Sequence, residues 1–141
     1  MMATKRMLHD KATLFVPMGE NDDGAMHYDV YILSTVFCRT GAGMTMNNGQ
    51  NPADSLDLYI FDTMSAITKN GAPMAVATAC ESIFHVIRDN PTAIDTSEKM
   101  YVLPYADSEA VKPPAMCRRV REIVRRKAGS TRMWHWEVHA K

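Results

Sequence analysis

The last 30 residues of this 141-residue chain constrain its fold more than any other part. Residues 112–141 hold two segments in which apolar and polar residues alternate, separated by a turn at Gly129. In the second segment, Trp134, Trp136 and Val138 fall on one side of an extended strand. Two tryptophans on one face form a large apolar surface that has to be buried. The pattern therefore predicts a strand that buries Trp134 and Trp136 together, in a core or an interface.

The first of these two segments, residues 116–127, fits two structures. Its apolar residues have helical spacing after Pro114, but residues 120–124 also alternate as a strand would. We favour the strand, because the short turn at Gly129 leads directly into an alternating partner. The choice between helix and strand stays open at this point.

The rest of the chain also reads as mainly β. Short alternating or β-branched runs, each bounded by turn residues, occur at residues 12–16, 26–38, 55–61, 65–68 and 100–103. We expect one domain over residues 1–141, a small β-barrel or sandwich with long loops. Residues 1–10 are expected to be flexible, and residues 39–53 form a long Gly- and Asn-rich loop of unassigned role.

One segment changes period. Apolar residues from Val76 to Ile87 recur at helical spacing after Pro73, and Asn90-Pro91 ends the pattern. These signals predict a single helix at about residues 73–89. Just before it, Asn70-Gly71 predicts a tight hairpin turn. Residues 20–24, which include three acidic residues and end in Gly24, predict a second hairpin turn.

The charge of the chain is unevenly distributed. Residues 112–141 carry nine basic residues against two acidic ones, a net charge of +7, whereas residues 1–111 carry a net charge of −7. No apolar run is long enough for a membrane span, and the N-terminus has no signal-peptide pattern. Three widely spaced cysteines without a CxxC motif predict reduced thiols.

The sequence offers no positive case for an enzyme. His135, Glu137 and His139 share a strand face and could contribute metal ligands, but no fourth ligand is identifiable. The polar outer face of a strand explains the same pattern. No nucleophile elbow or metalloprotease helix occurs. We therefore expect no catalytic residue, no bound metal and no cofactor.

The basic stretch is the feature with the clearest functional meaning. It predicts a contact with an acidic protein partner, including another copy of this chain, or with the phosphate backbone of DNA. These two readings are equally favoured. The residues expected to make the contact are Arg118, Arg119, Arg121, Arg125, Arg126, Lys127 and Arg132.

Several segments resemble small virion proteins of tailed bacteriophages, the minor capsid or head–tail connector proteins. The segments are ATLFVP at residues 12–17, DVYIL at 29–33, DSLDLYIF at 54–61, MYVLP at 100–104 and GSTRMWHWEV at 129–138. The last is the most specific of them. The resemblance implies a head-completion, stopper or minor capsid protein that forms a ring beneath the portal.

The resemblance also implies where the protein acts and with what. It would be made in the host cytoplasm and reside in the virion, between portal or adaptor proteins and tail-side proteins. Its ring would be homo-oligomeric, with non-specific contact to packaged DNA as a further expectation and no membrane. The number of subunits and the layer of the connector stay open. The alternative functions are a small nucleic-acid-binding protein that uses the basic segment and, less favoured, a metal-dependent enzyme.

Overall fold

The computed structural model describes residues 8–20, 22–40, 55–89 and 100–141. Eight strands and one α-helix occur in them, which confirms the prediction of a mainly β fold with a single helix. The elements are β1 (Asp10–Glu20), β2 (Met26–Thr40), β3 (Leu56–Phe61), β4 (Ala66–Lys69), β5 (Ala72–Met74), α1 (Val76–Asp89), β6 (Tyr101–Leu103), β7 (Arg118–Arg126), the short 3-10 helix η3 (Thr131–Met133) and β8 (His135–Ala140).

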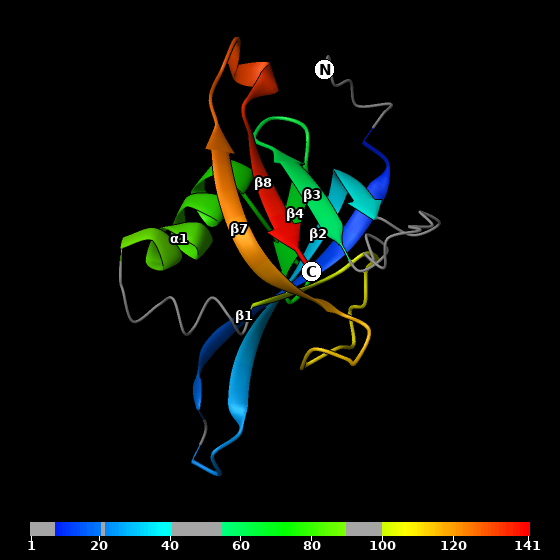
Figure 1. Cartoon of the computed structure of the whole chain (residues 1–141), viewed down its shortest axis with the longest axis vertical. Helices are drawn as coiled ribbons and strands as arrows, with labels where there is room; N and C mark the ends of the chain where they lie inside the picture. Colours follow the sequence, from blue (N-terminus) through cyan, green and yellow to red (C-terminus); the bar gives the residue numbers. More distant parts are fainter. Residues whose placement is uncertain (1–7, 21, 41–54, 90–99) are drawn as a thin grey trace, which may run out of the picture.

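Six of the strands form a nearly closed barrel (Figure 1). Their order is β1-β6-β7-β8-β3-β2, and β1 pairs with β2 to complete the ring. The hairpin of β4 and β5 continues the sheet from β2. Closing a sheet on itself leaves few free strand edges, which are otherwise sites of unwanted pairing. Of the two predicted architectures, the barrel is therefore the correct one.

Strand β2 changes neighbours along its length, and it bends where it does so. Residues 31–34 pair with β4, whereas residues 37–40 pair with β3. Between them, Thr35 has a φ of 53°, a left-handed conformation that is unfavourable for a β-branched residue. The register with β1 also shifts here. Thr35 therefore forms a bulge that turns β2 from the side hairpin into the barrel.

A serine holds this bend in place. The hydroxyl of Ser65 donates a 2.7 Å hydrogen bond to the carbonyl of Thr35 and accepts a 2.9 Å bond from the N–H of Phe61. Ser65 lies in the connection between β3 and β4, and its side chain ties the end of β3 to the bend in β2. Since strained backbone persists only where its surroundings fix it, Ser65 is part of what keeps the bend.

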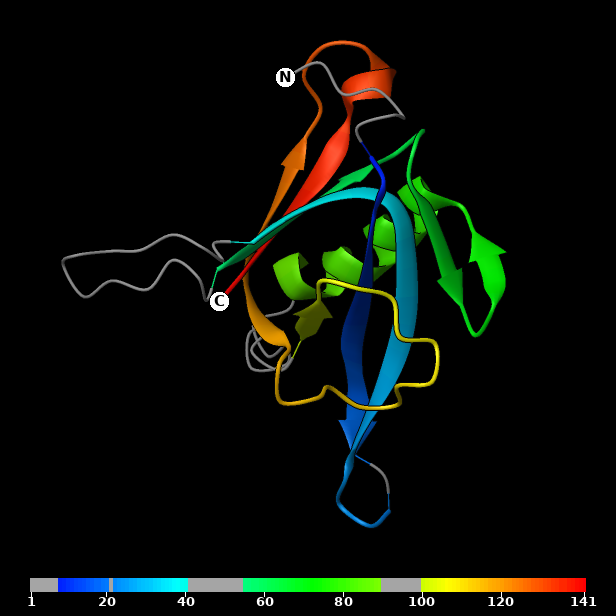
Figure 2. The same ribbon diagram turned by 90° about the vertical axis from the view of Figure 1, so that its right-hand side faces the viewer.

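The β1–β2 hairpin extends well beyond the barrel (Figures 1 and 2). Its pairing runs from Asp10 opposite Val36 to Glu20 opposite Met26, which confirms the predicted turn between them. The first strand is longer than the predicted run at residues 12–16, because β1 continues through Pro17 to Glu20. Strand β6 pairs only with residues 13–15, so the outer side of β1 beyond them is an edge, where proline is tolerated.

The helix begins three residues later than predicted. Residues 72–74 form β5 and pair with β4 across a turn in which Asn70 has a φ of 54° and Gly71 a φ of 81°. These angles are those of a type I′ turn, as the Asn-Gly pair predicts. Pro73 therefore lies in an edge strand instead of the first helical turn, and α1 starts at Val76.

The apolar stripe of α1 covers part of the core. Val76, Ala79, Cys80, Ile83 and Phe84 are buried in the same cluster as the inner residues of the barrel strands. Figure 2 shows the helix crossing between the β7–β8 strands and the β4–β5 hairpin. No helix in the described part of the chain has the length and apolar character needed to cross a membrane.

Two predicted segments fall largely outside the described residues. In the N-terminal segment predicted to be flexible, residues 1–7 lie outside the described residues. Leu8 is described, is 2% exposed and packs with Phe61. Asp10 begins β1. In the loop predicted at residues 39–53, residues 41–53 lie outside the described residues, and Arg39 and Thr40 belong to β2.

Candidate functional site

Residues 118–126 form strand β7, which confirms the strand reading of the basic segment. The pairing of β7 with β8 decides where its side chains lie. Val120 lies opposite Ala140, Ile123 opposite Val138 and Arg125 opposite Trp136, and these partners in β8 are all buried. The alternate residues of β7, including Arg126, lie on the outer face of the barrel. The predicted contact residues are therefore divided between two faces.

Arg125 belongs to the inner face. Its guanidinium donates two hydrogen bonds to the carboxylate of Asp62, 2.8 and 2.5 Å long, and lies 4.7 Å from the ring centre of Trp136. The side chains of Arg125 and Asp62 are 17% and 9% exposed. A two-pronged arginine–carboxylate pair of this kind is geometrically specific. Arg125 therefore holds the barrel together and has little surface to offer to a protein partner or DNA, contrary to the expectation.

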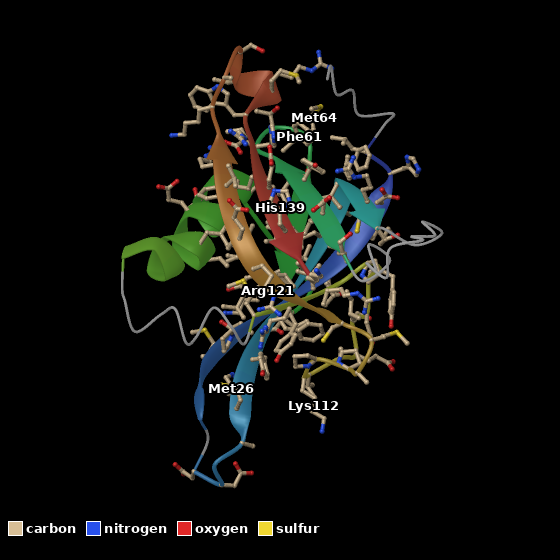
Figure 3. All side chains as sticks on the ribbon, viewed as in Figure 1. Met26, Phe61, Met64, Lys112, Arg121 and His139 are labelled. Atoms are coloured by element: carbon tan, nitrogen blue, oxygen red, sulfur yellow. The ribbon has the colours of Figure 1, made fainter. Side chains whose placement is uncertain are left out.

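The other six predicted residues do not form one patch. Arg118 donates a hydrogen bond to the carbonyl of Met116, and Arg119 is half-buried. Figure 3 shows Arg121 near the start of β7, away from the connection to β8. The remaining three, Arg126, Lys127 and Arg132, are exposed at the far end of β7 and in η3.

We call this far end the basic arm, defined as residues 126–132. Every residue in it is exposed. Arg126 forms a 3.1 Å ion pair with Glu137 but remains 57% exposed, and Lys127 lies 5.3 Å from the ring centre of Trp134. In both views the arm lies at one end of the long axis of the molecule (Figures 1 and 2).

The two tryptophans differ in environment. Trp136 is 4% exposed and packs on Phe84 of α1, with ring centres 5.1 Å apart. Trp134 lies just before β8 and is only half-buried, and its indole N–H donates to the carbonyl of Gly129. The prediction of a core position is therefore correct for Trp136. Within a single chain the two are not buried together, because β8 begins at His135 and Trp134 lies at the base of the arm.

The opposite end of the molecule is acidic. Asp22 and Asp23 are exposed in the turn of the β1–β2 hairpin, which we call the acidic tip. The carboxylate of Asp23 accepts a hydrogen bond from the N–H of Ala25, which shapes the turn. The tip and the basic arm lie at opposite ends of the long axis (Figure 1). Part of the uneven charge of the sequence is thus separated in space, with Arg126, Lys127 and Arg132 at one end and Asp22 and Asp23 at the other.

A polar network covers the outer face of β3 and β8. Glu137 accepts hydrogen bonds from Nε2 of His135 at 3.0 Å and of His139 at 3.2 Å. Nδ1 of His139 lies 2.7 Å from Asp57, which also pairs with Arg39 at 3.1 Å. The structure therefore brings together the three polar residues singled out in the sequence, and adds two from β2 and β3.

The position of His139 favours its charged form. Both ring nitrogens face carboxylate oxygens, so only the doubly protonated ring satisfies both contacts. Partial burial opposes the charge, but hydrogen bonds to Asp57 and Glu137 outweigh it and raise the pKa of His139 above its usual 6.5. Burial likewise opposes the charge of Asp57, yet His139 and Arg39 lower the pKa of that carboxyl.

A groove of about 310 Å³ lies beside this network. Three residues of the network line it, together with four apolar or aromatic ones: Arg39, His135, Glu137, Phe37, Tyr59, Phe61 and Met133. Met133 also packs against the small cluster formed by Leu8 and Phe61. The sequence showed Tyr59 and Phe61 on one side of a strand together with Asp57. It carried no signal that this side faces His135, 74 residues or more away along the chain, because only strand register decides that.

The described residues offer no arrangement of three or more His, Cys, Asp or Glu side chains that could hold a metal ion. Burial raises the pKa of Cys80 to about 12 and that of Cys38 to about 11. Both thiols are therefore protonated at neutral pH and are weak nucleophiles.

Comparisons with known proteins gave no match. No protein-family model matches the chain, and neither a curated protein sequence nor a solved structure matches it significantly.

Proposed function

We propose that this protein is a structural subunit of the head–tail connector of a tailed bacteriophage, assembled with copies of itself into a ring. The observation that carries the proposal is the separation of the basic arm from the acidic tip. Head-to-tail contacts join two different surfaces of one molecule, and they close into a ring when the rotation between copies allows it. The short segments that resemble connector proteins support the same reading.

The opposite charges also explain why copies would meet in one orientation. Arm against tip brings unlike charges together, whereas arm against arm or tip against tip places like charges side by side, which costs several kcal/mol. A ring further repeats each contact many times, so individually modest contacts add up. The ring would lie between the portal or adaptor on one side and tail proteins on the other, with no catalytic role for the subunit.

Two measurements test this proposal. Quantitative mass spectrometry of purified particles of the phage that encodes the chain should detect the protein in them. Its copy number per particle should be fixed and equal to the number of subunits in one ring or a multiple of that number. Analytical ultracentrifugation of the purified protein at low salt should show a discrete oligomer that weakens as salt is added. Absence from the particles, with a monomer at every concentration, would reject the connector function.

A nucleic-acid contact remains the second candidate, and it is favoured by one observation. The exposed charges of Arg126, Lys127 and Arg132 lie close together on a narrow projection. If these residues bind DNA instead of protein, rings should form normally in their absence. Affinity for duplex DNA should then fall steeply with salt.

A further inference from the structure

The segment between β6 and β7 exposes an unusual amount of apolar surface. Five large hydrophobic residues are exposed in the described part of the chain, and this segment holds three of them: Tyr105, Val111 and Met116. Val111 is 76% exposed. Exposed apolar side chains that gather on one segment mark an interaction surface more often than scattered ones do.

This segment is fixed to the barrel. The hydroxyl of Thr13, a buried residue of β1, donates a 2.7 Å hydrogen bond to the carbonyl of Tyr105 and accepts a 2.9 Å bond from the N–H of Asp107. The N–H of Glu109 in turn donates to the carboxylate of Asp107. The segment therefore presents Glu109 and Val111 from a defined position.

A groove of about 490 Å³ separates this segment from the β1–β2 hairpin. Val111 and Glu109 line one side, and His27 and Val30 of β2 line the other. Strand β4 pairs with β2 only as far as Tyr31. Among the described residues no strand pairs with residues 26–30 on that side, so this stretch of β2 offers a free edge to a neighbour.

The groove is bordered by negative charge. The side chain of Glu109 is exposed on its wall and has no ion pair among the described residues, and the acidic tip lies a few residues along the same hairpin from His27. Asp29 also lines the groove, but Lys69 neutralises it at 2.9 Å. The surface therefore fits a basic, exposed and narrow segment.

We propose that this groove receives the basic arm of a second copy of the chain. The inference rests on the proposed ring and names its two contact surfaces. Arg126, Lys127 and Arg132 would meet Glu109 and the acidic tip, and the arm would cover Val111. A molecule cannot fill its own groove, because its arm lies at the other end of the long axis (Figure 1). The contact is therefore between two copies and joins different surfaces, as a ring requires.

The first test is site-specific cross-linking. One tagged chain carries Val111→Cys and a second, differently tagged chain carries Ser130→Cys, both positions being exposed. Mild oxidation of the mixture should give a disulfide-linked pair that contains both tags. A mixture of Val111→Cys with Thr63→Cys, also exposed but between β3 and β4, is the control and should give none. Equal linkage in the two mixtures would overturn the assignment of the surfaces.

The second test is charge reversal with rescue. Glu109→Lys and Arg132→Glu should each weaken self-association at least about tenfold, because each places like charges together. Mixing the two variants should restore association, since each altered surface then meets its complement in alternating copies. Glu81→Lys, on the exposed side of α1, is the control and should have no effect.

The outcomes separate this inference from the proposed function. If the native chain forms rings but both reversals leave association unchanged, the ring uses other surfaces and the inference is wrong while the connector function stands. If each reversal weakens association but mixing restores nothing, the arm meets a different partner and the inference is also wrong. If the native chain forms no ring and is absent from particles, the proposed function itself fails.

Discussion

Arg125 donates two parallel hydrogen bonds to Asp62, although the two residues are 63 positions apart in the sequence. The pair ties β7 to the end of β3, on the side of the sheet that faces α1 and Trp136. Removing one partner of such a pair leaves a charge in a place where water cannot solvate it. Through this ion pair the basic segment stabilises the folded chain.

We predict that Arg125→Ala lowers the free energy of unfolding by about 3–5 kcal/mol, because it leaves the carboxylate of Asp62 without its partner. The neighbouring Arg126→Ala should cost no more than about 1 kcal/mol, since the Arg126 side chain is 57% exposed and Glu137 keeps its contacts with His135 and His139. Urea denaturation of both variants measures the difference. Equal effects would mean that the Arg125–Asp62 pair does not form.

The two tryptophans should also differ. Trp136→Ala removes a buried ring that packs on Phe84, and it should cost about 3–5 kcal/mol. Trp134→Ala removes a half-buried ring and should cost clearly less, while disturbing the arm. Thermal unfolding of the two variants, with association measured in parallel, separates these roles. A larger loss of stability in Trp134→Ala would contradict the assignment.

The polar network predicts a pH dependence of stability. The pKa of His139 is higher in the folded chain than in the unfolded chain, so its contribution is complete below pH 6.5 and is lost as the pH rises through the folded value. Asp57 and Glu137 behave oppositely, because their pKa values are lowered and their contributions are lost in acid. The charged groups around His139 are Asp57, Glu137, Glu122, Arg39 and Arg126.

Denaturation at about pH 5.5 and about pH 8.5 should show this effect. The native chain should lose stability at the higher pH relative to His139→Gln, whose side chain does not titrate. If the difference in stability between the two proteins is the same at both pH values, folding does not raise the pKa of His139.

The bend in β2 gives a fourth prediction. Ser65→Ala leaves the carbonyl of Thr35 and the N–H of Phe61 without their shared partner, and it should cost about 1–3 kcal/mol. Thr63→Ala, two residues away and exposed, is the matched control and should have little effect. Hydrogen exchange should show faster opening of β3 in the Ser65 variant, and unchanged exchange would argue against a role for Ser65 at the bend.

The strands could be predicted from the sequence because alternation of apolar residues reports one buried face directly. The side of strand β7 on which Arg125 lies could not be predicted from the sequence. Alternation that starts from Val120 places Arg125 outside, but Arg121 is an extra residue in β7, and the register shift moves Ile123 and Arg125 to the inner face. A single bulge moves every later side chain of the strand to the opposite face, and no residue type in this segment indicates that a bulge is present.

The helix starts later than the sequence predicts for a related reason. Pro73 is acceptable both in the first turn of a helix and in an edge strand, and only the pairing of β5 with β4 selects the strand. The network around His139 was equally hidden, because it depends on Asp57, 82 residues away. Local pattern predicts the elements, whereas register and bulges decide which charges meet.

Strand β2 reaches from the acidic tip to the barrel in 15 residues and bends at Thr35 on the way. The bend at Thr35 therefore joins the projecting hairpin to the part of β2 that pairs with β3. A force on the acidic tip would pass through the bend to the pairing of β2 with β3. Mechanical coupling of this kind needs only a strand that pairs with β4 on one side of a bend and with β3 on the other.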